Sequence, residues 1–397
     1  VMSKEIPSPG GVPLLGNVLQ VDAEQPHESL SQFSEIYGPI YKLHLPQPRI
    51  FVANYALARE LLDEKRFQKS VSGALEELRN VTHDSLFTAY NGEHNWEIAH
   101  RVLMPAFGPL AIRNMFPEMK DIASQMIVKW ARFGPDHLIS ASDEFTNLTL
   151  DSIALCAMGT RFNSFYHDQP HQFVTAMNSV LSESFNRSRR PNFIGGLYKE
   201  SNRQYEANIA AMEKITKDLL QDRLRNPCDK HDLLNAMING KDSKTGEKLS
   251  EDSIVSNMIT FLIAGHETTS GLLSFLFFEL LQNPEALKEA TKEVDTVIGS
   301  SPVEVDHMSK LPYIEACLRE TLRLHPTAPA FTLEAKGDQV LNGEYFVKDK
   351  ESCQIILMRV HRDPDVYGPD AEEFRPSRMY GENFNKLPPN SWKVSNI

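Results

Sequence analysis

Residues 264–270 read Ala-Gly-His-Glu-Thr-Thr-Ser, inside a long apolar stretch, and they combine side chains that could do chemistry. Polar groups in an apolar interior are costly unless they are bonded or functional. We expect the Thr268 hydroxyl to turn onto the carbonyl of Ala264, which would open the helix locally. Glu267 is expected to feed protons into the resulting notch. Ala264 and Gly265 leave the backbone accessible, so a flat ligand can lie against it.

A structural interpretation competes with this one. Thr268, Thr269 and Ser270 could simply bond back to their own helix, and an isolated Thr-Thr pair favours that interpretation. Glu267 reverses the preference, because an unpaired buried acid is costly. The sequence therefore favours a functional site in the middle of this helix.

The helix that carries this segment is expected to span Ser253–Gln282, because apolar residues occupy all of its sides. Ser250 with two following acids starts it, and Asn283-Pro284 ends it. The polar residues His266, Glu267 and Glu279 argue against a span through lipid. We expect the central helix of a large water-soluble domain.

Two further constellations carry charge or hydrogen-bond donors. Glu320 and Arg323 lie three residues apart on one helix face, and Arg378 could complete a buried cluster that serves as a structural lock. Trp96 and His100 lie four residues apart, and Lys69 could join them to bind paired carboxylates. For the second group an ordinary amphipathic helix with one buried Trp remains the alternative.

The rest of the chain predicts one mainly α-helical domain over residues 1–397 with a small β portion. A Pro- and Gly-rich lead-in at 7–17 cannot form helix. Residues 40–45 and 49–53 alternate as a hairpin does, and the spacing is mostly helical from about 55 to 325. Short strand-like runs follow at 331–336, 339–341 and 353–357.

Composition excludes several classes of protein. With 41 basic and 53 acidic residues the net charge is −12, which argues against a nucleic-acid partner. The four cysteines (Cys156, Cys228, Cys317 and Cys353) are scattered, as in a reduced intracellular protein, and do not form a zinc site. No apolar N-terminal run indicates a signal peptide or a membrane anchor, so we expect a cytoplasmic protein.

Taken in order, these motifs resemble the cytochrome P450 family across essentially the whole chain. They are the lead-in, Trp96-x-x-x-His100, the 264–269 segment, Glu320-x-x-Arg323 and Phe374-x-Pro376-x-Arg378. Residues 161–171, 261–275 and 327–331 are similar to the self-sufficient fatty-acid hydroxylases, whose haem domain is fused to a flavin reductase. The resemblance implies the P450 fold and a haem-thiolate monooxygenase that hydroxylates fatty acids or similar long apolar substrates with O2 and NADPH-derived electrons.

The resemblance also implies cofactors and residue roles. Haem b is expected, with FAD and FMN only if a reductase domain follows; a separate flavin reductase is the other electron donor. Thr268 and Glu267 would manage protons, and Ala264 and Gly265 would face the haem. The other implied roles are propionate binding by Lys69, Trp96 and His100, and shaping of the substrate pocket by Phe87, Ala328 and Phe331.

The chain departs from the family at its C-terminal end. The haem loop Phe-x-x-Gly-x-Arg-x-Cys-x-Gly is expected after Trp392-Lys393, but the chain reads Val-Ser-Asn-Ile to residue 397. We therefore expect an incomplete fold, no axial cysteine and no activity for this chain as written, whether through an incomplete gene reading or a real truncation. Alternatives are a haem-free remnant and a carrier of apolar ligands.

A second departure lies at the expected pocket mouth. Gln47 and Phe51 stand where close relatives place an Arg and a Tyr for a fatty-acid carboxylate. Arg49 is a plausible substitute, because alternate residues of a strand share one face. Another long apolar substrate therefore remains open.

Overall fold

The computed structural model describes residues 4–22, 24–190 and 198–392. The chain forms two compact units, unit 1 with residues 1–70 and 275–397 and unit 2 with residues 71–274. The predicted class, mainly α-helical with a small β portion, is confirmed. The divergent residues 394–397 lie outside the described part of the chain.

Unit 1 is built on a sheet in the order β1-β2-β7-β4-β3, in which only β2 and β7 pair in parallel. The strands are β1 (Ile40–Leu43), β2 (Arg49–Val52), β3 (Phe67–Lys69), β4 (Ala330–Ala335), β7 (Ser352–Ile356) and a separate pair, β5 (Gln339–Leu341) and β6 (Tyr345–Val347). The predicted hairpin is confirmed with Ile40 opposite Val52, and so are the later strands. The strands β3 and β6 were not predicted.

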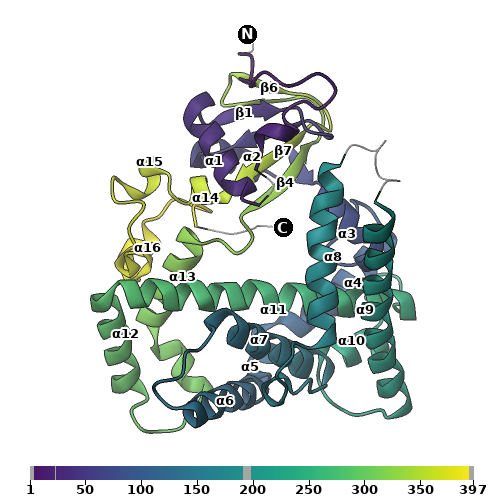
Figure 1. Ribbon diagram of the computed structural model, residues 1–397, viewed down its shortest axis with the longest axis vertical. Helices are drawn as coiled ribbons and strands as arrows, with labels where there is room; N and C mark the ends of the chain where they lie inside the picture. Colours follow the sequence, from purple (N-terminus) through teal and green to yellow (C-terminus); the bar gives the residue numbers. More distant parts are fainter. Residues whose placement is uncertain (1–3, 23, 191–197, 393–397) are drawn as a thin grey trace. The chain divides into compact units, whose positions relative to one another are not determined.

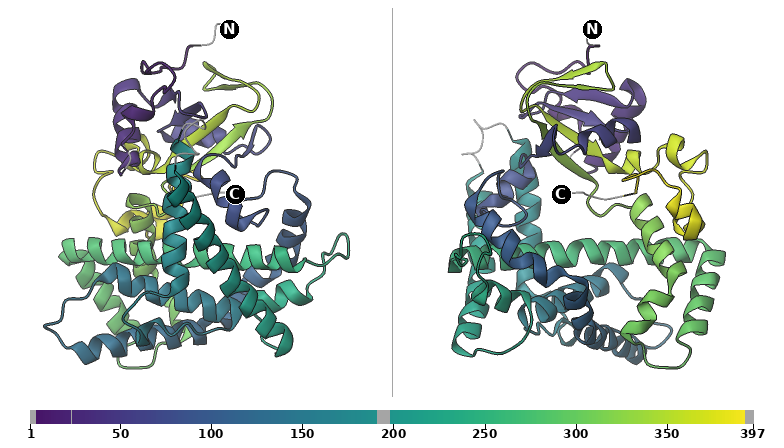
Figure 2. Two further views of the ribbon diagram at one scale, coloured as in Figure 1. Left: turned by 45° about the vertical axis from the view of Figure 1, so that its right-hand side comes forward. Right: turned by 180° about the vertical axis from the view of Figure 1, so that it is seen from behind.

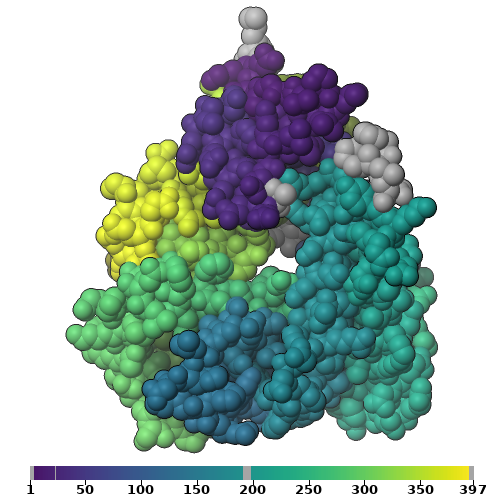
Figure 3. All heavy atoms as spheres, viewed as in Figure 1, coloured from purple at the N-terminus to yellow at the C-terminus, as the bar shows by residue number. Residues whose placement is uncertain are grey.

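Within unit 1, α1 packs on β1 through Leu30 and Tyr41, and α14 packs on β4 and β7 (Figure 1). The helices are α1 (Pro26–Tyr37), α2 (Tyr55–Leu61), α12 (Pro284–Val297), α13 (Pro312–Leu324), α14 (Leu357–Val360), α15 (Pro364–Tyr367) and α16 (Gly381–Asn385), with 3-10 turns η1 (Val18–Gln20), η5 (Val305–Lys310) and η6 (Pro376–Met379). The C-terminal segment, residues 357–392, lies against the N-terminal residues of unit 1 (Figure 3), and the Tyr55 N–H donates to Asp363 at 2.8 Å.

Unit 2 is helical, and α8 packs against both α9 and α3 (Figure 1). Its elements are α3 (Ala74–Thr82), α4 (His94–Leu103), η2 (Met104–Phe107), α5 (Pro109–Asn114), α6 (Phe116–Phe133), α7 (Ala141–Met158), η3 (Ser164–Tyr166), α8 (Gln172–Arg189), α9 (Lys199–Arg225), α10 (Leu233–Asn239) and the larger part of α11 (Glu251–Gln282). Its core joins Leu150, Phe173, Met212, Met258 and Leu262.

The long apolar stretch forms α11, which is continuous in both views of Figure 2. Among the described residues it alone is long and apolar enough to cross a membrane, a test that the core helix of a water-soluble protein also passes. Asn257, Thr260 and His266 are buried and bonded within unit 2. Because such polar groups would be costly in lipid, we assign the 254–263 part of α11 to the core of unit 2, whereas residues 264 and 267–269 are exposed.

Candidate functional site

The middle of α11 presents a small exposed face. Ala264 and Thr268 lie four residues apart and are both exposed, and the Thr268 hydroxyl donates to the Ala264 carbonyl at 2.8 Å. This bond was predicted and is confirmed. The expected local opening is not seen, because α11 stays α-helical through this segment.

Glu267 was expected to be a buried acid, and the structure contradicts this expectation. Its side chain is exposed and therefore pays no desolvation cost, so the preference based on a buried acid was wrong. His266, for which no site role was predicted, is buried in the same turn. Its ring Nδ1 donates to the Leu262 carbonyl at 2.7 Å, and burial lowers the pKa of His266. The Thr149 hydroxyl donates to the His266 carbonyl at 2.9 Å, which joins α7 to α11.

Gly265 faces a neighbouring helix. A Cβ at this position would lie 2.7 Å from Cγ1 of Ile153 on α7, closer than real Cβ contacts allow. The expectation that Gly265 faces a flat ligand is therefore corrected: its missing side chain makes room for helix packing. Ala264 is the exposed small residue.

Trp96 and His100 lie on α4 and stack with ring centroids 4.7 Å apart. The Trp96 Nε1–H donates to the Leu86 carbonyl at 3.2 Å. In this structure the indole therefore serves the backbone of the preceding turn, and the expectation that both donors point toward a carboxylate needs correction for Trp96.

Lys69, the third residue expected to bind carboxylates, belongs to unit 1, where it pairs with Leu333 across β3 and β4. Burial lowers the pKa of Lys69 to about 8. An ammonium that is desolvated in this way is stabilised by a nearby carboxylate.

Lys69 should therefore react with a small acylating reagent at pH 8 faster than the exposed Lys65 does, because its pKa is about 8. Its neutral fraction at that pH is about 10²-fold larger than that of an ordinary lysine. Since the pKa of unfolded lysine is near 10.4, charged Lys69 costs stability below pH 8, and this cost fades as the pH rises toward about 10.4. Mass spectrometry of labelled peptides measures the rates. Equal rates for Lys69 and Lys65 would contradict the lowered pKa.

The expected substrate residues fall in both units. Phe87 is exposed and belongs to unit 2, whereas Ala328 and Phe331 belong to unit 1. Ala328 is exposed in the segment before β4, and the half-buried Phe331 lies on β4 opposite Ile355.

The pocket mouth differs from expectation at Phe51, which is buried and stacks on Tyr41 at 5.3 Å. Phe51 is therefore a core residue between β2 and β1. Arg49 donates from Nη1 to the Gln354 Oε1 atom at 2.6 Å, and burial lowers the pKa of its guanidinium. Its charge thus lies on the sheet beside a neutral amide.

The predicted Glu320–Arg323–Arg378 cluster is confirmed. Arg323 binds both carboxylate oxygens of Glu320 at 2.8 Å, and both side chains are fully buried. The Arg378 Nε atom lies 3.3 Å from Glu320 Oε1. Arg323 also donates to the carbonyls of His361 and Ala371, so the cluster ties α13 to the C-terminal segment of unit 1.

The cysteines test whether a haem thiolate is available. Burial raises the pKa of Cys156 to about 11 and the pKa values of Cys317 and Cys353 to about 12, which keeps these thiols protonated. Cys228 is exposed in the loop after α9. Within residues 4–22, 24–190 and 198–392, three of the four thiols are therefore held protonated by burial, and the fourth, Cys228, lies in an exposed loop.

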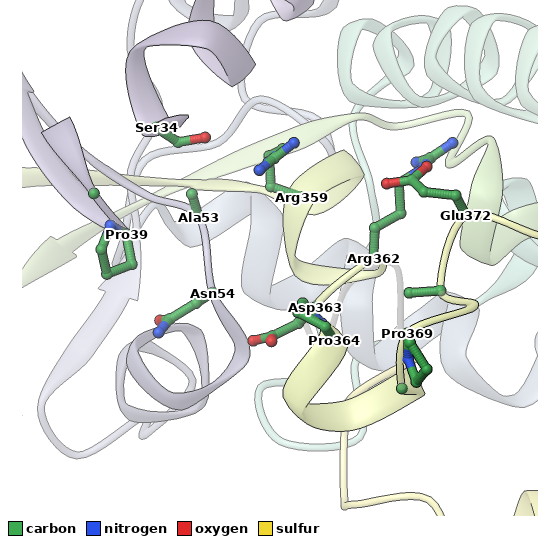
Figure 4. A pocket seen from close by; sticks show the side chains of 13 residues that line it. Ser34, Pro39, Ala53, Asn54, Arg359, Arg362, Asp363, Pro364, Pro369 and Glu372 are labelled. Atoms are coloured by element: carbon green, nitrogen blue, oxygen red, sulfur yellow. The ribbon is translucent and has the colours of Figure 1, made fainter. Parts of the chain in front are cut away.

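A shallow pocket of about 430 Å³ in unit 1 lies apart from these residues. Its lining includes Ser34, Asn54, Arg359, Arg362, Asp363 and Glu372 (Figure 4). The charged groups already have partners: Arg362 binds Glu372 at 2.8 Å, and Arg359 binds Glu35 at 3.1 Å. No site residue predicted from the sequence is among the described residues that line it.

Comparison with known proteins gives a consistent result. The cytochrome P450 family model matches residues 6–392. A bifunctional cytochrome P450/NADPH–P450 reductase of Aspergillus oryzae is 54% identical over 396 residues, which cover 98% of this chain and 36% of the relative. A similarly named protein, ascE of Acremonium egyptiacum, is 53% identical over 402 residues, 99% of this chain and 38% of the relative.

A third relative, a self-sufficient cytochrome P450 monooxygenase of Exserohilum turcicum, is 51% identical over 389 residues, 98% of this chain and 36% of the relative. The chain thus spans a little over a third of the length of these curated relatives.

Proposed function

Because the chain belongs to the cytochrome P450 family, we propose that it is the haem-binding part of a self-sufficient monooxygenase. The names of its relatives support a fused NADPH–P450 reductase as the electron donor, which would carry FAD and FMN. The proposed substrates are fatty acids or similar long apolar molecules, hydroxylated with O2.

The exposed Ala264–Thr268 face carries this proposal. Haem b, when bound, supplies the iron on which O2 is activated. Ala264 offers the small surface against which a flat macrocycle fits. The Thr268 hydroxyl, which rests on the Ala264 carbonyl at 2.8 Å, can turn to hold or pass a proton. Because Glu267 is exposed, it can exchange protons with solvent.

Three side chains, taken each within its own unit, support the apolar part of the proposal. Phe87, Ala328 and Phe331 offer apolar surface that is not fully buried. Arg49, whose guanidinium is desolvated by burial, is the residue proposed to bind a substrate carboxylate.

Replacing Thr268 with Ala tests the function. In the full-length protein we expect product formation to fall about 10²-fold with haem content unchanged, because a positioned proton carrier contributes about that much. Chromatography of hydroxylated fatty acids and the NADPH consumed per product provide the measurement.

Thr269→Ala is the matched control, since Thr269 is also exposed on α11 but its neighbour makes the bond to Ala264. Equal losses in both variants would contradict the role of Thr268. Wild-type protein that binds fatty acid without incorporating haem would instead support the carrier alternative, and protein that binds neither would support an inactive remnant.

A further inference from the structure

The turn that carries Phe87 is fixed by buried hydrogen bonds. It connects α3 to α4 and exposes the Phe87 side chain, 43% of which is accessible. The polar residues around it, Ser85 and Thr88, are fully buried. The exposed side chain of Phe87 is thus flanked in the turn by buried polar side chains.

Helix α11 supplies two of the hydrogen bonds that fix this turn. The Asn257 Oδ1 atom accepts the Leu86 N–H at 3.0 Å, and Asn257 Nδ2 donates to the Ser253 carbonyl at 2.8 Å. One turn further along α11, the Thr260 hydroxyl lies 2.7 Å from the Ser85 hydroxyl. Asn257 is fully buried and Thr260 nearly so, so both bonds are shielded from water.

The neighbouring helices hold the other side of Phe87. From α4, Trp96 Nε1–H donates to the Leu86 carbonyl at 3.2 Å, and from α3, Arg79 Nη1 donates to the Thr88 carbonyl at 2.6 Å. The Thr88 hydroxyl donates to the His83 carbonyl at 2.7 Å. The backbone is therefore held on both sides of Phe87, by groups from three helices of unit 2.

We propose that Asn257 and Thr260 are positioning residues that set the place of the Phe87 ring and thereby where a bound apolar chain ends. The inference rests on the proposed function, in which Phe87 contacts substrate. The side-chain nitrogen of Asn257 bonds to its own helix, and its side-chain oxygen bonds to the turn. Helix α11 would thus present Ala264 and Thr268 directly and would also hold Phe87 through its preceding turns.

Asn257→Leu tests the proposal because leucine has a similar volume but leaves the Leu86 N–H without its acceptor. Asn17→Leu is the matched control: Asn17 is equally buried in unit 1, accepts the His44 N–H at 2.7 Å and donates to the Pro9 carbonyl at 3.3 Å. Both variants lose a buried amide that accepts a backbone N–H, but only Asn257→Leu alters the turn that carries Phe87.

The first readout is 19F NMR of full-length protein with 4-fluorophenylalanine at position 87. We expect one narrow resonance in wild type and in Asn17→Leu, and a shifted or broadened one in Asn257→Leu. Thr260→Val, which removes one hydroxyl at constant shape, provides a second and milder variant if Asn257→Leu does not fold. An unchanged resonance in the folded variants overturns the proposal.

The second readout is the affinity for hexadecanoic acid in a double-mutant cycle. Asn257→Leu should weaken binding about fivefold in wild type and less than about twofold in the Phe87→Ala background, because its effect passes through Phe87. Equal weakening in both backgrounds overturns the positioning role. If wild type does not bind the acid, the proposed substrate class fails, and the 19F spectra still decide whether Asn257 positions Phe87.

Discussion

Replacing Glu320 with Gln is expected to lower the free energy of unfolding of unit 1 by about 3–5 kcal/mol, because removal of one partner leaves a buried charge uncompensated. Glu320 and Arg323 are both fully buried, and their paired bonds measure 2.8 Å. Gln keeps the shape of Glu but offers Arg323 a neutral oxygen and an N–H group that cannot accept a hydrogen bond from it.

The loss of stability should extend beyond Arg323, because the Glu320 carboxylate also interacts with other groups. Glu320 Oε1 accepts the Arg375 N–H at 3.0 Å and lies 3.3 Å from Arg378 Nε. Arg378 in turn donates to the Tyr367 carbonyl at 2.8 Å. A neutral residue at 320 therefore weakens the attachment of the C-terminal segment to α13.

Denaturant unfolding monitored by Trp392 measures this effect, with Trp96 and Trp130 replaced by Phe so that only unit 1 reports. Glu373→Gln is the control, because Glu373 is exposed and its ion pair with Arg375 at 2.8 Å is expected to contribute less than about 1 kcal/mol. A loss for Glu320→Gln no larger than that of the control would show that the cluster does not lock unit 1.

The sequence predicted those parts of the fold that depend on local patterns. The 40–53 hairpin follows from alternation, and α11 follows from an apolar run too long for a strand. Glu320 and Arg323 were predicted as a buried pair because they share a helix face among leucines. Each of these inferences needs only residues that are near one another in the chain.

The errors arose where the environment of a side chain depends on how separate elements pack, whether those elements are near or far apart in the chain. The strand β3 has only three residues, and its pairing with β4 crosses more than 260 positions. Phe51 was assigned to a pocket mouth because strand position alone does not show that Tyr41 covers it. In the same way, the bond from Trp96 to Leu86 depends on how the turn before α4 folds, and Glu267 is exposed because α11 is not packed on all sides.

A second buried ion pair, in unit 2, went unnoticed in the sequence because Arg223 and Asp232 lie in a polar stretch that reads as surface. Asp232 is buried and accepts two bonds from Arg223 at 3.0 and 2.9 Å. It also caps α10 by accepting the Asn235 N–H at 2.8 Å. Gly159 leaves the space for this pair, since a Cβ there would lie 2.6 Å from the Arg223 guanidinium.

Asp232→Ala should therefore lower the free energy of unfolding of unit 2 by about 3–5 kcal/mol through the unpaired guanidinium, with a further loss of about 1 kcal/mol for the helix cap. Asp232→Asn keeps a capping oxygen and should lose less, so the difference between the two variants separates the cap from the charge. Fluorescence of Trp130, with the other two tryptophans replaced, reports on unit 2. Asp229→Ala, in the exposed loop before α10, should change stability by less than about 0.5 kcal/mol. If Asp232→Ala resembles Asp229→Ala, Arg223 keeps its charge solvated without Asp232, and the pair does not hold α9 to α10.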